Sequence, residues 1–180
     1  MKKYAIDGSF TGVVFNKISK KLIYQFKYQP YLSGLSGFIA DLLYESLIQN
    51  EEFNRILSSQ LFFIPIPLSS ARFKKRGYNQ AEILAKSLGK KFGFPVYNCL
   101  TRVKETRSQV GLSKKERKEN VKGAFDINSK FKNQKSKFVN RNILLVDDVL
   151  TTGSTFSEAG LLLKRAGAAK VWAVAFAREQ

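Results

Sequence analysis

The sequence predicts an α/β protein with a mainly parallel central sheet flanked by helices. Between residues 61 and 177, short runs of branched and aromatic apolar residues alternate with longer stretches of helical periodicity, as in chains that build parallel sheets. The run at 143–146 consists of four branched apolar residues and is typical of a buried strand. With 180 residues, of which 44% are hydrophobic, the chain can form one domain over 1–180 with a sizeable core.

Residues 1–60 are expected to form an N-terminal layer of one strand and helices. The segment 4–15 is strand-like, Asn16 is suited to cap a first helix, and a second helix is expected to end near Asn50. No chemical motif occurs in this part, so we interpret it as packing. The apolar residues at helical spacing are Ile18, Leu22, Ile23 and Phe26, followed by Phe38, Ile39, Leu42, Leu43 and Leu47.

The core is expected over 61–180 and begins with a short buried strand at 61–64. Pro65 and Pro67 end this strand, because neither residue can donate a hydrogen bond to a ladder. The next segment, 68–80, is expected to be a loop that carries four basic residues within five positions.

A helix is expected after Asn79, whose side chain can cap it, and Gly93 and Pro95 end it. Two further strands are predicted at 96–100 and 123–127. The apolar face of the helix consists of Ala81, Leu84, Ala85, Leu88 and Phe92.

Two connecting segments are polar and rich in lysine. Residues 101–122 are basic, and Ser113 with Glu116 has the spacing of a capping box for a short helix. Residues 128–142 have no clear period, so we expect a surface loop there.

The stretch 143–155 is the most informative part of the chain. Asp147 and Asp148 follow the predicted buried strand, and ligands of parallel sheets bind at the carboxyl ends of strands. Gly153 lets the backbone approach an anion, and the helix that follows offers unpaired N–H groups. These features predict a phosphate loop beside two carboxylates that suit hydroxyl groups or a cation. The hydroxyl donors of the loop are Thr151, Thr152, Ser154 and Thr155.

The last two elements follow directly. Thr155 and Glu158 have the spacing of a second capping box. A strand is predicted at 171–176. The apolar face of the intervening helix consists of Phe156, Ala159, Leu162, Leu163 and Ala166.

The composition limits the possible chemistry. The chain has 31 Lys and Arg against 14 Asp and Glu, a net charge of +17, which indicates either attraction to polyanions or a lysine-rich solvated surface. With no histidine and Cys99 as the single cysteine, histidine bases, disulfides within the chain and cysteine-cluster metal sites are excluded. The longest apolar runs are far shorter than the roughly 18 residues that span a membrane, so we expect a cytoplasmic protein.

A purely structural interpretation of the acidic stretch, with a buried strand, two solvated aspartates and a capped helix, stays open, whereas three others fail. A receiver domain carries paired acids early in its fold, whereas only 25 residues follow Thr155. The loop lacks the Gly-Lys-Ser/Thr of a Walker A motif, and the chain lacks the Gly-x-Gly-x-x-Gly of a dinucleotide-binding fold.

The stretch 143–155 resembles the phosphoribosyl pyrophosphate signature of type I phosphoribosyltransferases: four apolar residues, two acids and a short Thr/Gly loop. The segment Arg76-Gly77-Tyr78-Asn79-Gln80, after Pro65-Ile66-Pro67, is similar to the ComF family, which is linked to bacterial competence for DNA uptake. The resemblance extends over roughly residues 10–177 and implies a type I phosphoribosyltransferase-like fold with a mobile hood at about 101–122. Three shorter motifs also fit the family: Thr106-x-x-Gln109-x-x-Leu112, Arg117-x-x-Asn120 and Gly123-Ala124-Phe125.

The resemblance also implies roles for individual residues around phosphoribosyl pyrophosphate. Asp147 and Asp148 would hold the ribose 2′- and 3′-hydroxyls, directly or through Mg²⁺. The residues that would wrap the 5′-phosphate are Thr151, Thr152, Gly153, Ser154 and Thr155.

The pyrophosphate half of the site is implied in the same way. The segment Leu68-Ser69-Ser70 would form the pyrophosphate loop, together with Arg76. Arg102 and Lys104 of the hood would neutralise the pyrophosphate as it leaves.

The chain departs from the family at two points. ComF proteins usually begin with a cysteine-rich zinc-binding segment, and because Cys99 is the single cysteine, we expect that segment to be missing. Thr151 stands where purine-salvage members carry an acid that contacts the base, which argues against purine salvage.

Three functions stay open. The first is a Mg²⁺-dependent phosphoribosyltransferase with an unknown nitrogen acceptor. The second is a non-catalytic competence factor that binds single-stranded DNA or a protein of the competence machinery, and the third is a sensor of phosphoribosyl pyrophosphate. Basic residues interleaved with aromatic ones could bind single-stranded nucleic acid by charge and stacking, although we favour a solvated loop that also attracts pyrophosphate. These residues are Arg72, Phe73, Lys74, Lys75, Arg76 and Tyr78. The oligomeric state also stays open.

Overall fold

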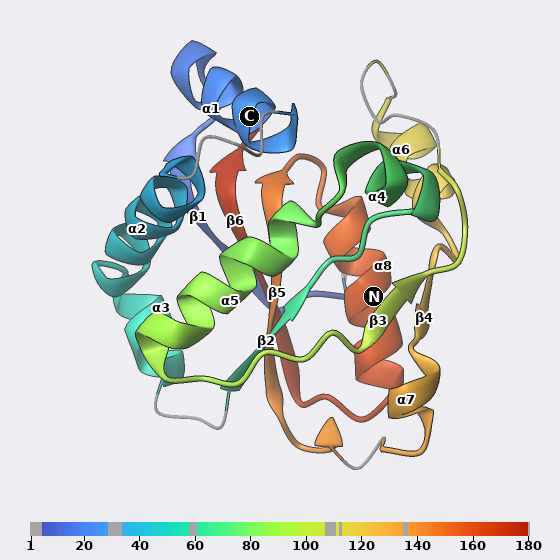
Figure 1. Ribbon diagram of the computed structural model, residues 1–180. Coiled ribbons are helices and arrows are strands. Elements are labelled where there is room, and N and C mark those ends of the chain that lie inside the picture. The colour runs from blue at the N-terminus through green and yellow to red at the C-terminus, as the bar shows by residue number, and fades with distance from the viewer. Residues whose placement is uncertain are drawn as a thin grey trace.

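The computed structural model describes residues 5–28, 34–57, 61–106, 111, 113–134 and 137–179. Its centre is a sheet of four parallel strands in the order β1-β6-β5-β2, which Figure 1 shows running between layers of helices. The predicted α/β class with a mainly parallel sheet is therefore confirmed. The strands are β1 (Gly8–Val14), β2 (Leu61–Pro65), β5 (Asn142–Leu150) and β6 (Lys170–Arg178).

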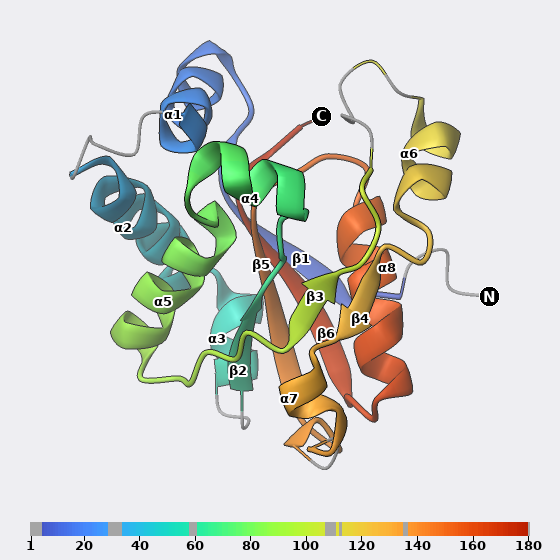
Figure 2. The same cartoon turned by 45° about the vertical axis from the view of Figure 1, so that its right-hand side comes forward.

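Helices cover both faces of this sheet (Figures 1 and 2). Side chains of β5 alternate between the two faces, so Leu144 and Val146 pack into one core cluster and Ile143 and Leu145 into the other. The run of consecutive apolar residues thus reflects a strand that is buried on both sides. One face carries α2 (Leu35–Ile48), α3 (Glu51–Leu57) and α5 (Gln80–Phe92), and the other carries α8 (Ser154–Arg165).

A separate antiparallel pair of strands lies beside α8 (Figure 2). It joins β3 (Leu100–Arg102) to β4 (Phe125–Ile127). Between these strands the structure describes α6 (Lys114–Val121), whose predicted capping box of Ser113 and Glu116 is present.

The predicted cap of α5 is also confirmed. The Asn79 side chain accepts a hydrogen bond from the Ala81 backbone N–H at 3.1 Å, and Gly93 ends the helix at a φ of 73°. At the start of α1 (Lys17–Tyr28), Asn16 Oδ1 accepts from the backbone of Ser19.

The basic segment predicted to be a loop is a helix, α4 (Ser70–Arg76). Gly77 ends it with a φ of 78°. None of its side chains is buried, so the helix needs no apolar face. The sequence therefore lacks the apolar periodicity by which helices are predicted.

Four other expectations were wrong in detail. The strand predicted at 96–100 begins only at Leu100, and the connector 128–142 contains the helix α7 (Ser129–Lys132) and the fully buried Phe138. Two residues assigned to apolar helix faces, Ile18 and Phe38, are 72% and 50% exposed.

The second capping box is absent as well. Helix α8 begins at Ser154, so Thr155 already lies inside it, and the N-cap is Gly153. Glu158 instead accepts a hydrogen bond from the Gly123 backbone N–H at 2.7 Å, so its carboxylate connects α8 to the turn before β4.

Candidate functional site

The two aspartates lie inside β5, which continues past them to Leu150. The prediction that the strand ends before the acids was therefore wrong, although both still lie near its carboxyl end. Asp148 is buried at 6% exposure and Asp147 is half-buried. The Asp148 backbone N–H donates to Asp147 Oδ1 at 2.8 Å, which fixes one carboxylate relative to the other.

The acid pair has an unusual electrostatic environment. Burial, followed by the neighbouring charge of Asp148, raises the pKa of Asp147 to about 7, because a desolvated carboxylate beside another carboxylate is costly to ionise. The Asp148 backbone N–H and Lys27 act in the opposite direction. The pair therefore favours a cation or hydroxyl donors as ligands.

Lys27 contacts the candidate site, and the sequence interpretation did not single it out. Its Nζ lies 2.7 Å from Asp148 Oδ2, so α1 reaches the acid pair from a layer in which we expected no chemistry. The two residues are 121 positions apart in the chain, and nothing in the local sequence distinguishes Lys27 from the other lysines.

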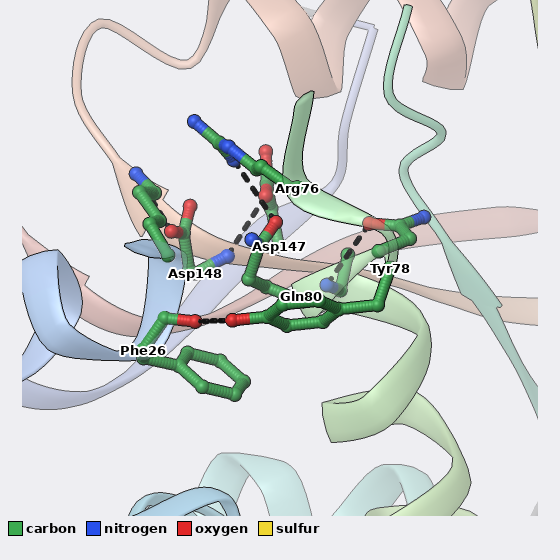
Figure 3. A network of polar contacts seen from close by, with 9 residues as sticks. Phe26, Arg76, Tyr78, Gln80, Asp147 and Asp148 are labelled. Carbon is green, nitrogen blue, oxygen red and sulfur yellow. Dashed lines mark hydrogen bonds and ion pairs between the residues drawn. The ribbon is translucent and has the colours of Figure 1, made fainter. Parts of the chain in front are cut away.

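Tyr78 connects the same helix to the segment before α5. Its hydroxyl donates to the Phe26 backbone carbonyl (Figure 3), and the two rings lie 6.5 Å apart. Burial raises the pKa of Tyr78 against the opposing effects of Gln80 and Arg76, and the charge of Asp148 also raises it. Tyr78 therefore contacts α1 one residue before Lys27.

The predicted phosphate loop lies where β5 passes into α8. Gly153 has a φ of 74°, a conformation that side chains disfavour, and this allows the chain to turn sharply into the helix. The hydroxyls of Thr152 and Ser154 form a hydrogen bond of 2.8 Å. The first turn of α8 has no side-chain cap, so its N–H groups are placed to bind an anion.

The segment assigned to pyrophosphate lies at the start of α4. Ser69 is its N-cap and is buried at 1% exposure, and the Ala71 backbone N–H donates to Glu105 Oε1 at 3.1 Å. The nearby Ser69 hydroxyl and then the Ala71 N–H lower the pKa of Glu105. The predicted pyrophosphate loop thus already holds one carboxylate of the chain.

Arg76 lies at the other end of α4, away from Ser69 and Ser70. Its guanidinium donates to Gln80 Oε1 at 3.0 Å and lies 5.2 Å from the centre of the Tyr28 ring. Figure 3 shows it on the side of the site that holds Asp147. Of the four residues assigned to the pyrophosphate loop, Arg76 therefore lies apart from the other three and closer to the acid pair.

The start of the predicted hood bends back over α4. Arg102 and Arg72 both donate to Thr106, the first to its hydroxyl and the second to its carbonyl at 3.2 Å. Burial and then the charge of Arg72 lower the pKa of Arg102, whereas Asp147 opposes this shift. Arg102 is thus held near the acid pair, while Lys104 is exposed. Gln109 and Leu112 of the family-like motif lie outside the described residues.

A pocket of about 450 Å³ opens between α4 and β3. Leu68 and Ser70 line it on one side, and Thr101 and Arg102 line it on the other. Its position places an open volume between the predicted pyrophosphate loop and the predicted hood.

The donor set tests whether a metal ion fits. Within the described ranges, no group of three or more His, Cys, Asp or Glu side chains could hold a metal ion. Asp147 and Asp148 alone match Mg²⁺, which is often bound by one or two carboxylates while substrate oxygens and water complete its shell. The residues therefore fit a metal ion that binds together with a substrate. The described residues also contain no helix that is long and apolar enough to cross a membrane.

Comparison with known proteins agrees with this geometry. The family model described as "Phosphoribosyl transferase domain" matches residues 73–180. Competence protein F of Haemophilus influenzae is 37% identical over 157 residues, which cover 86% of this chain and 66% of that protein. DNA utilization protein YhgH of Escherichia coli K12 is 32% identical over 83% of this chain and 63% of that protein. Competence protein ComFC of Bacillus subtilis is 28% identical over 87% and 58%.

The parallel sheet, the strand-end acids and the matched family model together define a phosphoribosyl transferase domain. Given the competence proteins among its relatives, the chain belongs to the ComF family of proteins that carry this domain. The chain spans less than two thirds of the length of these curated relatives.

Proposed function

We propose that this protein binds phosphoribosyl pyrophosphate with Mg²⁺ and transfers the phosphoribosyl group to a nitrogen acceptor. The observation that carries the proposal is the buried acid pair of β5, followed within a few residues by the Gly153 turn and the uncapped start of α8. Asp147 and Asp148 accept hydrogen bonds from the ribose hydroxyls. The 5′-phosphate binds the N–H and hydroxyl donors of Thr151, Thr152, Gly153, Ser154 and Thr155.

The reaction would be a displacement at C1 of the ribose. The C1–O bond to pyrophosphate breaks and its electron pair leaves with the pyrophosphate, a C1–N bond forms, and the acceptor nitrogen loses its proton to solvent. Arg102 and Lys104 belong to the segment assigned to the hood, and Arg72 lies on α4 beside it. These cations neutralise the charge of the pyrophosphate as it leaves, and such electrostatic stabilisation is usually the largest single contribution to catalysis. Bound Mg²⁺ would supply further neutralisation of the phosphate oxygens.

A binding assay and an activity assay test this proposal. Phosphoribosyl pyrophosphate with Mg²⁺ should raise the melting temperature of the wild-type protein, and Asp148→Asn should abolish the increase. Asp126→Asn is the matched control, because Asp126 pairs with Lys132 at a half-buried position on β4. No increase at millimolar ligand would contradict the proposal.

The activity assay measures pyrophosphate release over a panel of bases and amines. Release with one class of acceptor would identify the substrate. A protein that binds the donor but releases no pyrophosphate with any acceptor would instead be a sensor.

Single-stranded DNA binding is a second candidate, favoured by one surface feature. Tyr24 and Tyr28 are 61% and 45% exposed, with ring centres 4.9 Å apart. The charged groups of Lys75 and Arg76 lie 6.0 and 5.2 Å from the centre of the Tyr28 ring. Exposed rings beside cations are the combination that holds unpaired bases by stacking and charge.

Fluorescence anisotropy with a labelled thymidine oligonucleotide tests this candidate. Binding should weaken steeply with salt, and replacing Tyr24 and Tyr28 by Ala should cost about 1–3 kcal/mol per stacked base. Replacing the exposed Lys90 and Lys130 by Ala removes charge elsewhere and is the control. Equal losses in the two double variants would show that the tyrosines bind no bases.

A further inference from the structure

The contact between α1 and the acid pair brings a cation to the place where a ligand is expected. Lys27 Nζ lies 2.7 Å from Asp148 Oδ2, and the side chains are 23% and 8% exposed. Two neighbouring carboxylates of low exposure need positive charge nearby, because little water reaches them to stabilise their negative charge. Among the residues that the structure describes, Lys27 is the one basic residue that forms an ion pair with either aspartate.

The position of Lys27 does not depend on this ion pair. Phe26 and Ile23 anchor α1 in the core, and the Phe26 carbonyl accepts the Tyr78 hydroxyl (Figure 3). The Ser19 hydroxyl also donates to the Val14 carbonyl at 3.0 Å, which holds the start of α1 against the end of β1. The fold therefore presents the ammonium to Asp148, and removing it should leave the helix in place.

Two other cations close by, Arg76 and Arg102, are engaged elsewhere. The Arg76 guanidinium donates to Gln80 and lies over the Tyr28 ring. The Arg102 guanidinium donates to the Thr106 hydroxyl and lies over the Phe125 ring. Lys27 thus supplies the charge that a divalent ion would otherwise bring to the pair.

We propose that Lys27 is a built-in counter-ion of the acid pair and competes with a divalent cation for Asp148. This inference rests on the proposed function, in which the same carboxylates bind ribose hydroxyls and Mg²⁺. The wild-type site binds a metal ion weakly on its own, because the ammonium already occupies one carboxylate oxygen. Lys27 is therefore a positioning residue that sets how strongly the donor site depends on metal.

The test measures Mn²⁺ binding by calorimetry without any phosphoribosyl pyrophosphate. Lys27→Met removes the charge and keeps most of the side chain, and it should bind Mn²⁺ at least about tenfold more tightly than wild type. Lys27→Arg keeps a positive charge, so its Mn²⁺ binding should stay as weak as that of wild type. Lys21→Met, at an exposed position on the same helix, is the matched control and should bind as wild type does.

Three outcomes are decisive. Tighter binding in Lys27→Met that disappears when Asp148→Asn is added supports the inference. Equal Mn²⁺ affinity in wild type and Lys27→Met overturns it, and so does an equal gain in Lys21→Met, because either result shows that the ammonium does not compete at Asp148.

The design separates this inference from the proposed function. If phosphoribosyl pyrophosphate raises the melting temperature of none of these proteins, the proposed function fails, while the Mn²⁺ comparison still decides the role of Lys27. If the donor binds but the Mn²⁺ affinities are equal, the inference about Lys27 fails alone.

Discussion

Two glycines in helices should respond in opposite ways to replacement by alanine. Gly37 lies on α2 at an exposed position, and a Cβ there would meet no atom within 4 Å. Gly37→Ala should stabilise the protein by about 0.5–1 kcal/mol, because alanine loses less backbone entropy than glycine when a helix forms.

Gly89 is buried on α5, where the chain returns toward β2. A Cβ there would lie 2.5 Å from Val96 Cγ2 and 2.8 Å from the Phe94 carbonyl oxygen. The valine methyl could rotate away. The Phe94 carbonyl cannot, because it belongs to the backbone, and the Phe94 N–H is held by a hydrogen bond to the Gly89 carbonyl. Overpacking of this kind costs about 1–3 kcal/mol, which equals or exceeds the gain of about 1 kcal/mol in helix propensity.

Urea denaturation of wild type, Gly37→Ala and Gly89→Ala measures both effects. Gly89→Ala should lower the free energy of unfolding by up to about 2 kcal/mol and the melting temperature by roughly 2–4 °C per kcal/mol. If Gly89→Ala stabilised the protein as much as Gly37→Ala does, the close approach of α5 to residues 94–96 would be refuted.

Three further predictions concern the site and the core. Glu105→Gln should bind inorganic pyrophosphate several-fold more tightly in calorimetry, because the Glu105 carboxylate now accepts the Ala71 N–H that a pyrophosphate would use. Cys99 is buried and burial raises its pKa to about 12, so iodoacetamide at pH 8 should label it only after unfolding, as mass spectrometry would show. Tyr78→Phe should lower the free energy of unfolding by about 1–3 kcal/mol, because the Phe26 carbonyl loses its donor.

Each of these has a control and a contradicting result. Glu119→Gln removes an exposed acid on α6 and should leave pyrophosphate affinity unchanged; an equal gain there would point to net charge alone. Rapid labelling of Cys99 in the native protein would contradict its burial. Tyr24→Phe, at an exposed ring, should leave the free energy of unfolding unchanged. An equal loss in both tyrosine variants would show that the hydrogen bond from Tyr78 to Phe26 is not the cause.

The sheet and most of the helices could be predicted because their signals are local. Branched apolar runs gave the buried strands, and the cap at Asn79 and the capping box at Ser113 follow from side chains within three residues of the N–H groups they bind. Helix α4 was missed because none of its side chains is buried. The burial of Phe138 was missed because the lysine-rich segment around it has no periodicity.

The candidate site was predictable only in part. Asp147 and the Gly153 turn are neighbours in the chain, so their association follows from the end of one strand and the start of one helix. The contacts of Lys27 with Asp148, and of Glu105 with Ala71, join elements that are distant in sequence. Such contacts depend on how the layers pack, and no spacing in the sequence encodes them.

The segment Arg76–Gln80 illustrates how a short motif can support a site through contacts within the protein. Asn79 caps α5 through its oxygen, and its amide nitrogen donates to the Ile66 carbonyl at 3.0 Å, so one side chain joins α5 to the end of β2. Tyr78 binds the Phe26 carbonyl, next to Lys27. Tyr78 thus holds α1 and Asn79 holds α5, so substitution of Tyr78 should change the position of Lys27 and, through it, the environment of Asp148.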